Sequence, residues 1–145
     1  NICRSPMAEA VFSHKVTASN LQNRFIIDSA GTAGYHVGEN PDRRTIQACQ
    51  RHGVPINHIA REVVEEDFCT FDYMLCMDNS NLENLQEMKS RIPGSIAIVK
   101  LFGDYDPLGE RIIRDPYYGG NESFERNFQQ VSRCSEAFLQ SLGLE

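Results

Sequence analysis

The sequence predicts a single α/β domain in which helices flank a parallel sheet. Short apolar segments of strand composition alternate with segments of helical spacing, and the last of these helical patterns is the clearest. A chain of 145 residues is large enough to bury one core, and it contains no repeats or linkers. We therefore expect one domain over residues 1–145, with ligands bound outside the carboxyl ends of the strands.

The first helix is predicted to begin with Ser5 as its N-cap and Pro6 at its first position, and to end near Ala18. Unpaired N–H groups and the helix dipole make such a start a good site for an oxyanion, and Arg4 adds a planar fork for two oxygens. An ordinary capped helix with a surface arginine remains the alternative. The residues expected on its inward face are Met7, Ala10, Val11 and His14.

Strands and helices are then expected in turn along the chain. β-branched and aromatic residues predict strands over 24–30, 71–77 and 96–102, and glycines with a proline predict a loop over 34–41. A second helix is predicted over 42–52, with Asp42 as its cap and Gly53 after its end. A third helix is predicted after Asp78, with an apolar face of Leu82, Leu85 and Met88. The last helix is predicted from its apolar face of Phe124, Phe128, Val131, Phe138, Leu139 and Leu142.

Composition limits the classes of function. Hydrophobic residues make up 41% and charged residues 23% of the chain, which is typical of a globular domain. A net charge of −6 argues against a general nucleic-acid or anionic-membrane binder, and no apolar run is long enough to span a bilayer. Five cysteines without the spacing of a zinc site indicate reduced thiols, so we expect a cytoplasmic protein.

A second candidate for chemistry lies before the last helix, at Asp115-Pro116-Tyr117-Tyr118-Gly119. A carboxylic acid on a proline-stiffened loop beside aromatic rings suits a general acid that faces an aromatic substrate. The same residues also suit an ordinary turn, since Asp-Pro begins many turns and glycine ends them. Local chemistry alone leaves both interpretations open.

Both candidate segments resemble one family. Residues 1–10 closely resemble the phosphate-binding loop of the low-molecular-weight protein tyrosine phosphatases, which reads C-L-G-N-I-C-R-S-P, and residues 115–119 resemble its general-acid loop. The resemblance implies a three-layer domain with a four-stranded parallel sheet flanked by helices. Further matches are Asp28-Ser29-Ala30, Arg51-His52-Gly53, residues 71–78 and Tyr105-Asp106-Pro107.

The resemblance also implies a reaction. A cysteine thiolate would attack phosphorus, Arg4 would clamp the phosphoryl oxygens, and Asp115 would act as general acid and then as general base. Ser5 would donate a hydrogen bond to the thiolate when it leaves. The family nucleophile stands six positions before the loop arginine, so Cys3 matches the second cysteine of the loop instead. We therefore expect either that the nucleophile and the first, central strand precede Asn1, or that the chain is truncated and does not catalyse.

The remaining site residues follow from the same resemblance. The substrate-binding positions are Asn1, Ile2, Cys3, Arg4, Tyr35, Tyr117 and Tyr118. The residues that support the loop are Asn1, Ser29 and His58. Protein-arginine phosphatases usually carry threonine where this chain has Ile2. The expected partners are phosphotyrosine proteins or small aryl phosphates, with inorganic phosphate, sulfate or vanadate as ligands, and we expect a monomer without a metal or cofactor.

Two other functions are compatible with parts of this pattern. Arsenate reductases of the same fold use a similar loop with two further redox cysteines, of which the first falls near Cys76, whereas Glu83 stands where the second should follow. A non-catalytic oxyanion-binding module would keep Arg4 and the helix start without a nucleophile. Cys3 is expected either to protect the nucleophile through a reversible disulfide or simply to be buried. Structural roles are expected for Cys49, Cys69, Cys76, Cys134, His14, His36 and His52.

Overall fold

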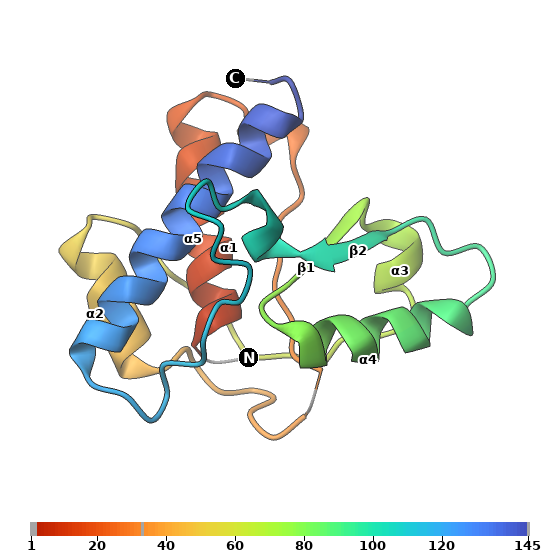
Figure 1. The fold of residues 1–145 in the computed structure, drawn as a ribbon, viewed down its shortest axis with the longest axis horizontal. Helices are drawn as coiled ribbons and strands as arrows, with labels where there is room; N and C mark the ends of the chain where they lie inside the picture. Colours follow the sequence, from red (N-terminus) through yellow and green to blue (C-terminus); the bar gives the residue numbers. More distant parts are fainter. Residues whose placement is uncertain (1–2, 33, 145) are drawn as a thin grey trace.

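The computed structural model describes residues 3–32 and 34–144. In this part of the chain, β1 (Tyr73–Cys76) pairs in parallel with β2 (Ile98–Leu101), with Tyr73 opposite Ile98 and Cys76 opposite Leu101. The connection between them is α4 (Asn79–Ser90), as expected for a β-α-β unit. Figure 1 shows α1, α2 and α5 packed together on one side of this sheet, with α3 and α4 on the other. The predicted α/β class with parallel strands is therefore confirmed.

The first helix begins earlier than predicted. Helix α1 spans Arg4–Ala18, and Cys3 occupies its N-cap position without a side-chain hydrogen bond, so the prediction of Ser5 as the cap is wrong. Pro6 is tolerated at the third helical position because the first N–H groups of a helix have no intrahelical acceptor. The predicted inward position of His14 is also wrong, since this side chain is exposed. Helix α1 is buried on a broader face than its sequence pattern indicates, because it packs against both α2 and α5; Ala8, Phe12 and Val16 are buried as well.

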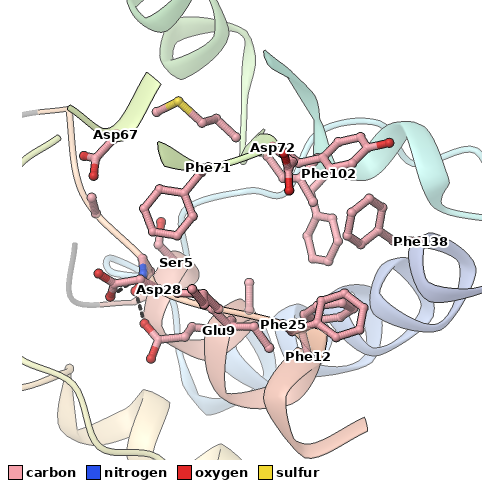
Figure 2. Close-up of a pocket in the computed structure, with 18 of the residues that line it drawn as sticks. Ser5, Glu9, Phe12, Phe25, Asp28, Asp67, Phe71, Asp72, Phe102 and Phe138 are labelled. Atoms are coloured by element: carbon pink, nitrogen blue, oxygen red, sulfur yellow. Dashed lines mark hydrogen bonds between the residues drawn. The ribbon is translucent and has the colours of Figure 1, made fainter. Parts of the chain in front are cut away.

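The predicted strand over 24–30 is not formed. A short 3₁₀ turn, η1 (Gln22–Arg24), is followed by extended chain, whose one bridge to other described residues is the parallel pair of Gly31 and Glu62. A cavity of about 740 Å³ lies between this extended chain and β1, and its rim carries five phenylalanine rings (Figure 2). Within the described residues, no hydrogen-bonded ladder joins the chain over 25–30 to β1. The rings are those of Phe12, Phe25, Phe71, Phe102 and Phe138.

The same cavity changes the burial of β1. The sequence predicts a buried strand over 71–77, yet only Cys76 of the four strand residues is fully buried. Tyr73, Met74 and Leu75 line the cavity and are therefore half-buried. Within the residues that the structure describes, β1 is hydrogen bonded along one edge, to β2.

Two helix starts agree with their predicted caps. Helix α2 (Arg43–Arg51) begins after Asp42, whose side chain accepts a hydrogen bond from the backbone N–H of Arg44 at 2.8 Å. Helix α4 begins after Asp78, which accepts from the N–H of Asn81 at 2.9 Å. Gly53 follows α2 with φ +68°, a conformation that favours glycine, so it ends this helix as predicted.

The last helix, α5 (Asn121–Ser141), confirms the clearest prediction. Five of its predicted face residues are buried, namely Phe124, Phe128, Val131, Phe138 and Leu139. The sequence does not predict the single turns η1, α3 (Asp67–Thr70) and η2 (Phe102–Tyr105), because one turn is too short to show a period. Across residues 3–32 and 34–144, no helix combines the length and apolar composition that a bilayer crossing requires.

Candidate active site

The N-terminus of α1, the carboxyl end of β1 and the loop before α5 meet at a cleft of about 440 Å³. This is the edge of the sheet at which ligands bind in α/β folds. The cleft brings together most of the residues predicted for the site, although Asn1 and Ile2 lie outside the described residues. The predicted residues that line it are Cys3, Arg4, Ser5, Tyr35, Asp115, Tyr117 and Tyr118, together with His36.

Arg4 is held in place from two sides. Its Nη1 donates to Asp78 Oδ2 at 2.8 Å and to the carbonyl of Ile113 at 2.7 Å, and its side chain is only 16% exposed. Burial opposes the charge on Asp78, but the N–H of Asn81 and the guanidinium of Arg4 more than offset it and lower the pKa of this carboxyl. Both of these bonds use Nη1, which leaves the Nε and Nη2 donors of Arg4 for an oxyanion in the cleft.

Cys3 is a buried thiol rather than a reactive thiolate. Its side chain is 6% exposed, and its carbonyl accepts a hydrogen bond from Thr45 Oγ1 at 3.3 Å. Burial, with smaller contributions from the nearby charges of Asp42 and Asp115, raises the pKa of Cys3 to about 12. A thiol with this pKa stays protonated at neutral pH, so Cys3 is poorly suited to be a nucleophile. This agrees with its match to the second cysteine of the family loop.

Asp115 lies on the exposed loop before α5 and lines the cleft, and the predicted turn in its segment is confirmed. Its Oδ1 accepts a hydrogen bond from the N–H of Tyr117 at 3.0 Å, which forms the expected turn. The turn directs the carboxylate into the cleft beside the two aromatic rings of Tyr117 and Tyr118, whose centroids lie 5.0 Å apart in an edge-to-face arrangement. Tyr35 and Tyr118 are 89% and 95% exposed, so their rings are available to a substrate.

Ser29 and His58 do not line the cleft; they lie behind it, against α1. Ser29 Oγ donates to Glu9 Oε1 at 2.7 Å, and His58 Nδ1 lies 3.1 Å from the same oxygen. Burial raises the pKa of Glu9, whereas the Ser29 hydroxyl and His58 lower it. These contacts join Ser29 and His58 to Glu9 of α1. Glu9, Asp28 and His58 also place metal-ligand atoms within 4.8 Å of one another, but hydrogen bonds and ion pairs within the group already engage them.

The sequence did not reveal four residues that shape this site. Asp78 was predicted only as a cap, although its place after a parallel strand is a usual position for a functional carboxylate. Glu9 and Thr45 act through tertiary contacts with Ser29 and Cys3, which no local pattern shows. Arg44 has the appearance of a surface arginine in the sequence, yet it donates to the loop that carries Asp115.

Comparisons with known proteins agree with this geometry. A family model described as low molecular weight phosphotyrosine protein phosphatase matches residues 1–145. A human protein of that name is 49% identical over 140 residues, which cover 97% of this chain and 89% of the relative.

Two solved structures are similar in fold along nearly the whole chain. A Drosophila arginine phosphatase has a TM-score of 0.92 and 40% identity, and the match covers 98% of this chain and 92% of that one. A protein tyrosine phosphatase from Entamoeba histolytica, crystallised with Hepes in its active site, has a TM-score of 0.88 and 33% identity, covering 99% and 91%.

Proposed function

Since the chain belongs to the low molecular weight phosphotyrosine protein phosphatase family, we propose that it hydrolyses phosphotyrosine in proteins, and small aryl phosphates, through a phosphocysteine intermediate. The observation that carries this proposal is the meeting of Arg4, at the start of α1, with Asp115 and two tyrosine rings in one cleft. An anion-binding helix start, a cationic clamp, a carboxylic acid and an aromatic wall are the parts that this reaction requires.

In the first step, a cysteine thiolate attacks phosphorus, so that an S–P bond forms while the P–O bond to the phenol breaks. The resemblance implies that this cysteine stands six positions before Arg4, and the raised pKa of Cys3 supports a thiol other than Cys3. Arg4 binds two equatorial oxygens with its Nε and Nη2 donors and stabilises their charge. Asp115 gives its proton to the departing phenolate oxygen.

In the second step, water attacks phosphorus and the S–P bond breaks. Asp115, now ionised, takes a proton from this water, and inorganic phosphate leaves. Ser5 donates its hydroxyl proton in a hydrogen bond to the thiolate that departs. Asp115 donates a proton in the first step and accepts one in the second, so the loop around it must keep its position through the cycle.

The cleft also favours a class of substrate. Tyr117, Tyr118 and Tyr35 offer exposed rings beside the anion site, which suits a phosphorylated phenol. Inorganic phosphate, sulfate and vanadate fit the same donors as ligands. We propose that the protein acts as a monomer of one domain in the cytoplasm, and that the reaction runs on these side chains without a metal or cofactor.

Phosphoarginine is the second candidate substrate, because an arginine phosphatase is among the similar structures, at 40% identity. The sequence favours phosphotyrosine, since Ile2 stands where protein-arginine phosphatases usually carry threonine.

The test is hydrolysis of matched phosphotyrosine and phosphoarginine peptides by protein expressed from its complete coding region. We expect vanadate-sensitive release of phosphate that is faster from phosphotyrosine, and a loss of about 10²-fold or more in kcat for Asp115→Asn. Glu122→Gln, which removes one exposed acid from the first turn of α5, is the matched control and should leave kcat unchanged. Faster hydrolysis of phosphoarginine, or an Asp115→Asn variant with full activity, would contradict the proposal.

A further inference from the structure

The loop over residues 110–119 has no regular secondary structure, and side chains from three helices hold its carbonyl groups. In its first half, four carbonyl groups accept hydrogen bonds from side chains of α5 and α1. Gln130 Nε2 donates to the carbonyls of Glu110 and Ile112, each at 3.0 Å. Arg4 donates to the carbonyl of Ile113, and Asn127 Nδ2 donates to the carbonyl of Arg114 at 3.0 Å.

The second half of the loop, which follows the acid, is held by Arg44 from α2. Arg44 Nη2 donates to the carbonyl of Tyr117 at 2.7 Å, and Nη1 donates to the carbonyl of Gly119 at 2.9 Å. These bonds cross more than 70 positions in sequence and join the start of α2 to the start of α5. Two parallel N–H donors from one planar group fix the orientation of the loop as well as its distance.

Arg44 is itself held in one conformation. Its Nε lies 3.2 Å from Asp42 Oδ1, and the same oxygen accepts the backbone N–H of Arg44 at 2.8 Å. Its guanidinium carbon lies 4.4 Å from the ring centroid of Phe124, which is fully buried at the start of α5. A guanidinium that is stacked and ion-paired in this way has little rotational freedom left to lose when it binds the loop.

Tyr117 connects the guanidinium of Arg44 to the carboxyl group of Asp115. Tyr117 donates its N–H to Asp115 Oδ1 at 3.0 Å and accepts from Arg44 through its carbonyl. We propose that Arg44 is a positioning residue that holds the Asp115 carboxyl where it can protonate the leaving phenolate. This inference rests on the proposed function. Without Arg44 the half of the loop after Asp115 loses two anchors, and a shift of about 1 Å in a reacting group can cost on the order of 10²-fold in rate.

The test compares Arg44→Met with Arg43→Met in protein expressed from its complete coding region. Arg43 is exposed and adjacent in α2, so both variants lose one charge from the same helical turn. The substrates are phenyl phosphate, whose leaving group needs a proton, and p-nitrophenyl phosphate, whose leaving group needs it far less. We expect Arg44→Met to lower kcat/KM by about tenfold or more for phenyl phosphate, and by less than about threefold for p-nitrophenyl phosphate.

Two further measurements separate positioning from a general loss of structure. Amide hydrogen exchange at residues 117–119 should be faster in Arg44→Met than in Arg43→Met, while exchange within α5 stays unchanged. Arg44→Lys, which can reach one carbonyl but cannot bind two in parallel, should recover only part of the lost activity on phenyl phosphate.

Equal losses on both substrates would overturn the inference, because a general structural effect does not distinguish leaving groups. The same holds if Arg43→Met reproduces the effect of Arg44→Met. A wild-type protein that hydrolyses neither ester would instead overturn the proposed function, and with it the role of Arg44 in that reaction. An active wild type with a selective loss in Arg44→Met supports both.

Discussion

The guanidinium of Arg4 and the carboxylate of Asp78 form a 2.8 Å ion pair at the base of the cleft. Asp78 uses its two oxygens for different purposes: Oδ2 accepts from Arg4, while Oδ1 accepts from the N–H of Asn81 and caps α4. The phosphate clamp is therefore anchored on the helix that follows the sheet. Any displacement of Asp78 would therefore shift Arg4 in the cleft and weaken the N-cap of α4.

Asp78→Asn should separate these two roles. Asparagine is also a good N-cap, so α4 should keep its stability, but the neutral amide holds Arg4 less firmly. Loss of a charge-assisted hydrogen bond of about 1.5–3 kcal/mol predicts a rise of about tenfold or more in the inhibition constant of vanadate. The measurements are vanadate inhibition and urea unfolding. Weaker inhibition with unchanged unfolding is expected, and unchanged inhibition would show that Asp78 does not orient the clamp.

The stability of the domain should depend on pH through the ion pair between Asp106 and Arg133. Arg133 Nε and Nη2 donate to the two oxygens of Asp106, each at 3.0 Å. Burial opposes the charge on Asp106, but Arg133 and the N–H of Leu108 more than offset it, so the pKa of Asp106 lies below its ordinary value of 3.8. Asp106→Asn should therefore lower the free energy of unfolding by about 2 kcal/mol at pH 7.

The sign of this pH dependence follows from the lowered pKa. The ionised Asp106 stabilises the fold above pH 3.8, and this contribution is lost as the pH falls below that value. Urea unfolding of wild type and Asp106→Asn should thus converge as the pH falls below 3.8. Asp104→Asn, which breaks the pair of Asp104 with the exposed Arg111, is the control, and its cost should stay within about 1 kcal/mol. A gap between wild type and Asp106→Asn that does not narrow in acid would contradict the prediction.

Gly103 should not tolerate a side chain. A Cβ atom on this buried residue would overlap the backbone carbonyl of Arg111, which cannot move without displacing the loop toward the site. Gly103→Ala should cost more than about 2 kcal/mol of stability, measured by thermal or urea unfolding. In Gly34→Ala the new atom overlaps the end of the Glu62 side chain, which can rotate away, and makes an ordinary contact with Val37. A similarly small loss of stability in both variants would mean that the backbone at Arg111 can shift at little cost.

Thiol reactivity offers a test of burial. Four of the five cysteines of this sequence are buried, whereas Cys69 is exposed, so the expectation of a structural role does not fit its environment. Burial raises the pKa of Cys3, Cys76 and Cys134 to about 12 and that of Cys49 to about 11. Cys69→Ser should therefore remove one fast-reacting thiol from a titration of the native protein with an aromatic disulfide. Cys49→Ser should leave the fast phase unchanged, and the opposite result would place Cys49 within reach of solvent.

The parts of the fold that the sequence predicts are those with local causes. The sequence predicts the caps at Asp42 and Asp78 and the apolar face of α5 correctly, because each depends on residues within a few positions of one another. The prediction of a strand over 24–30 is wrong, because a strand needs a partner along its edge and the sequence pattern shows only its faces. The inward position predicted for His14 is wrong for a similar reason: spacing gives the face of a helix but not which neighbours cover it.

The site divides in the same way. Arg4 and Asp115 were found because their surroundings in sequence resemble those of a family, and the cleft brings them together. Arg44 and Glu9 act on residues far away in the chain, so the pairs Arg44–Tyr117 and Glu9–Ser29 become visible only in three dimensions. Supporting residues of this kind are the hardest to predict from one sequence, because no local pattern shows which distant residue a charged side chain contacts.

The groove beside β1 has a consequence for handling the protein. Extended chain over 25–30 and the edge of β1 flank an aromatic-lined cavity. Within the described residues this edge of β1 has no partner strand, and an unpaired edge can pair with a strand of another copy. Concentrated refolding should therefore favour pairing between copies and aggregation, whereas dilution should suppress both.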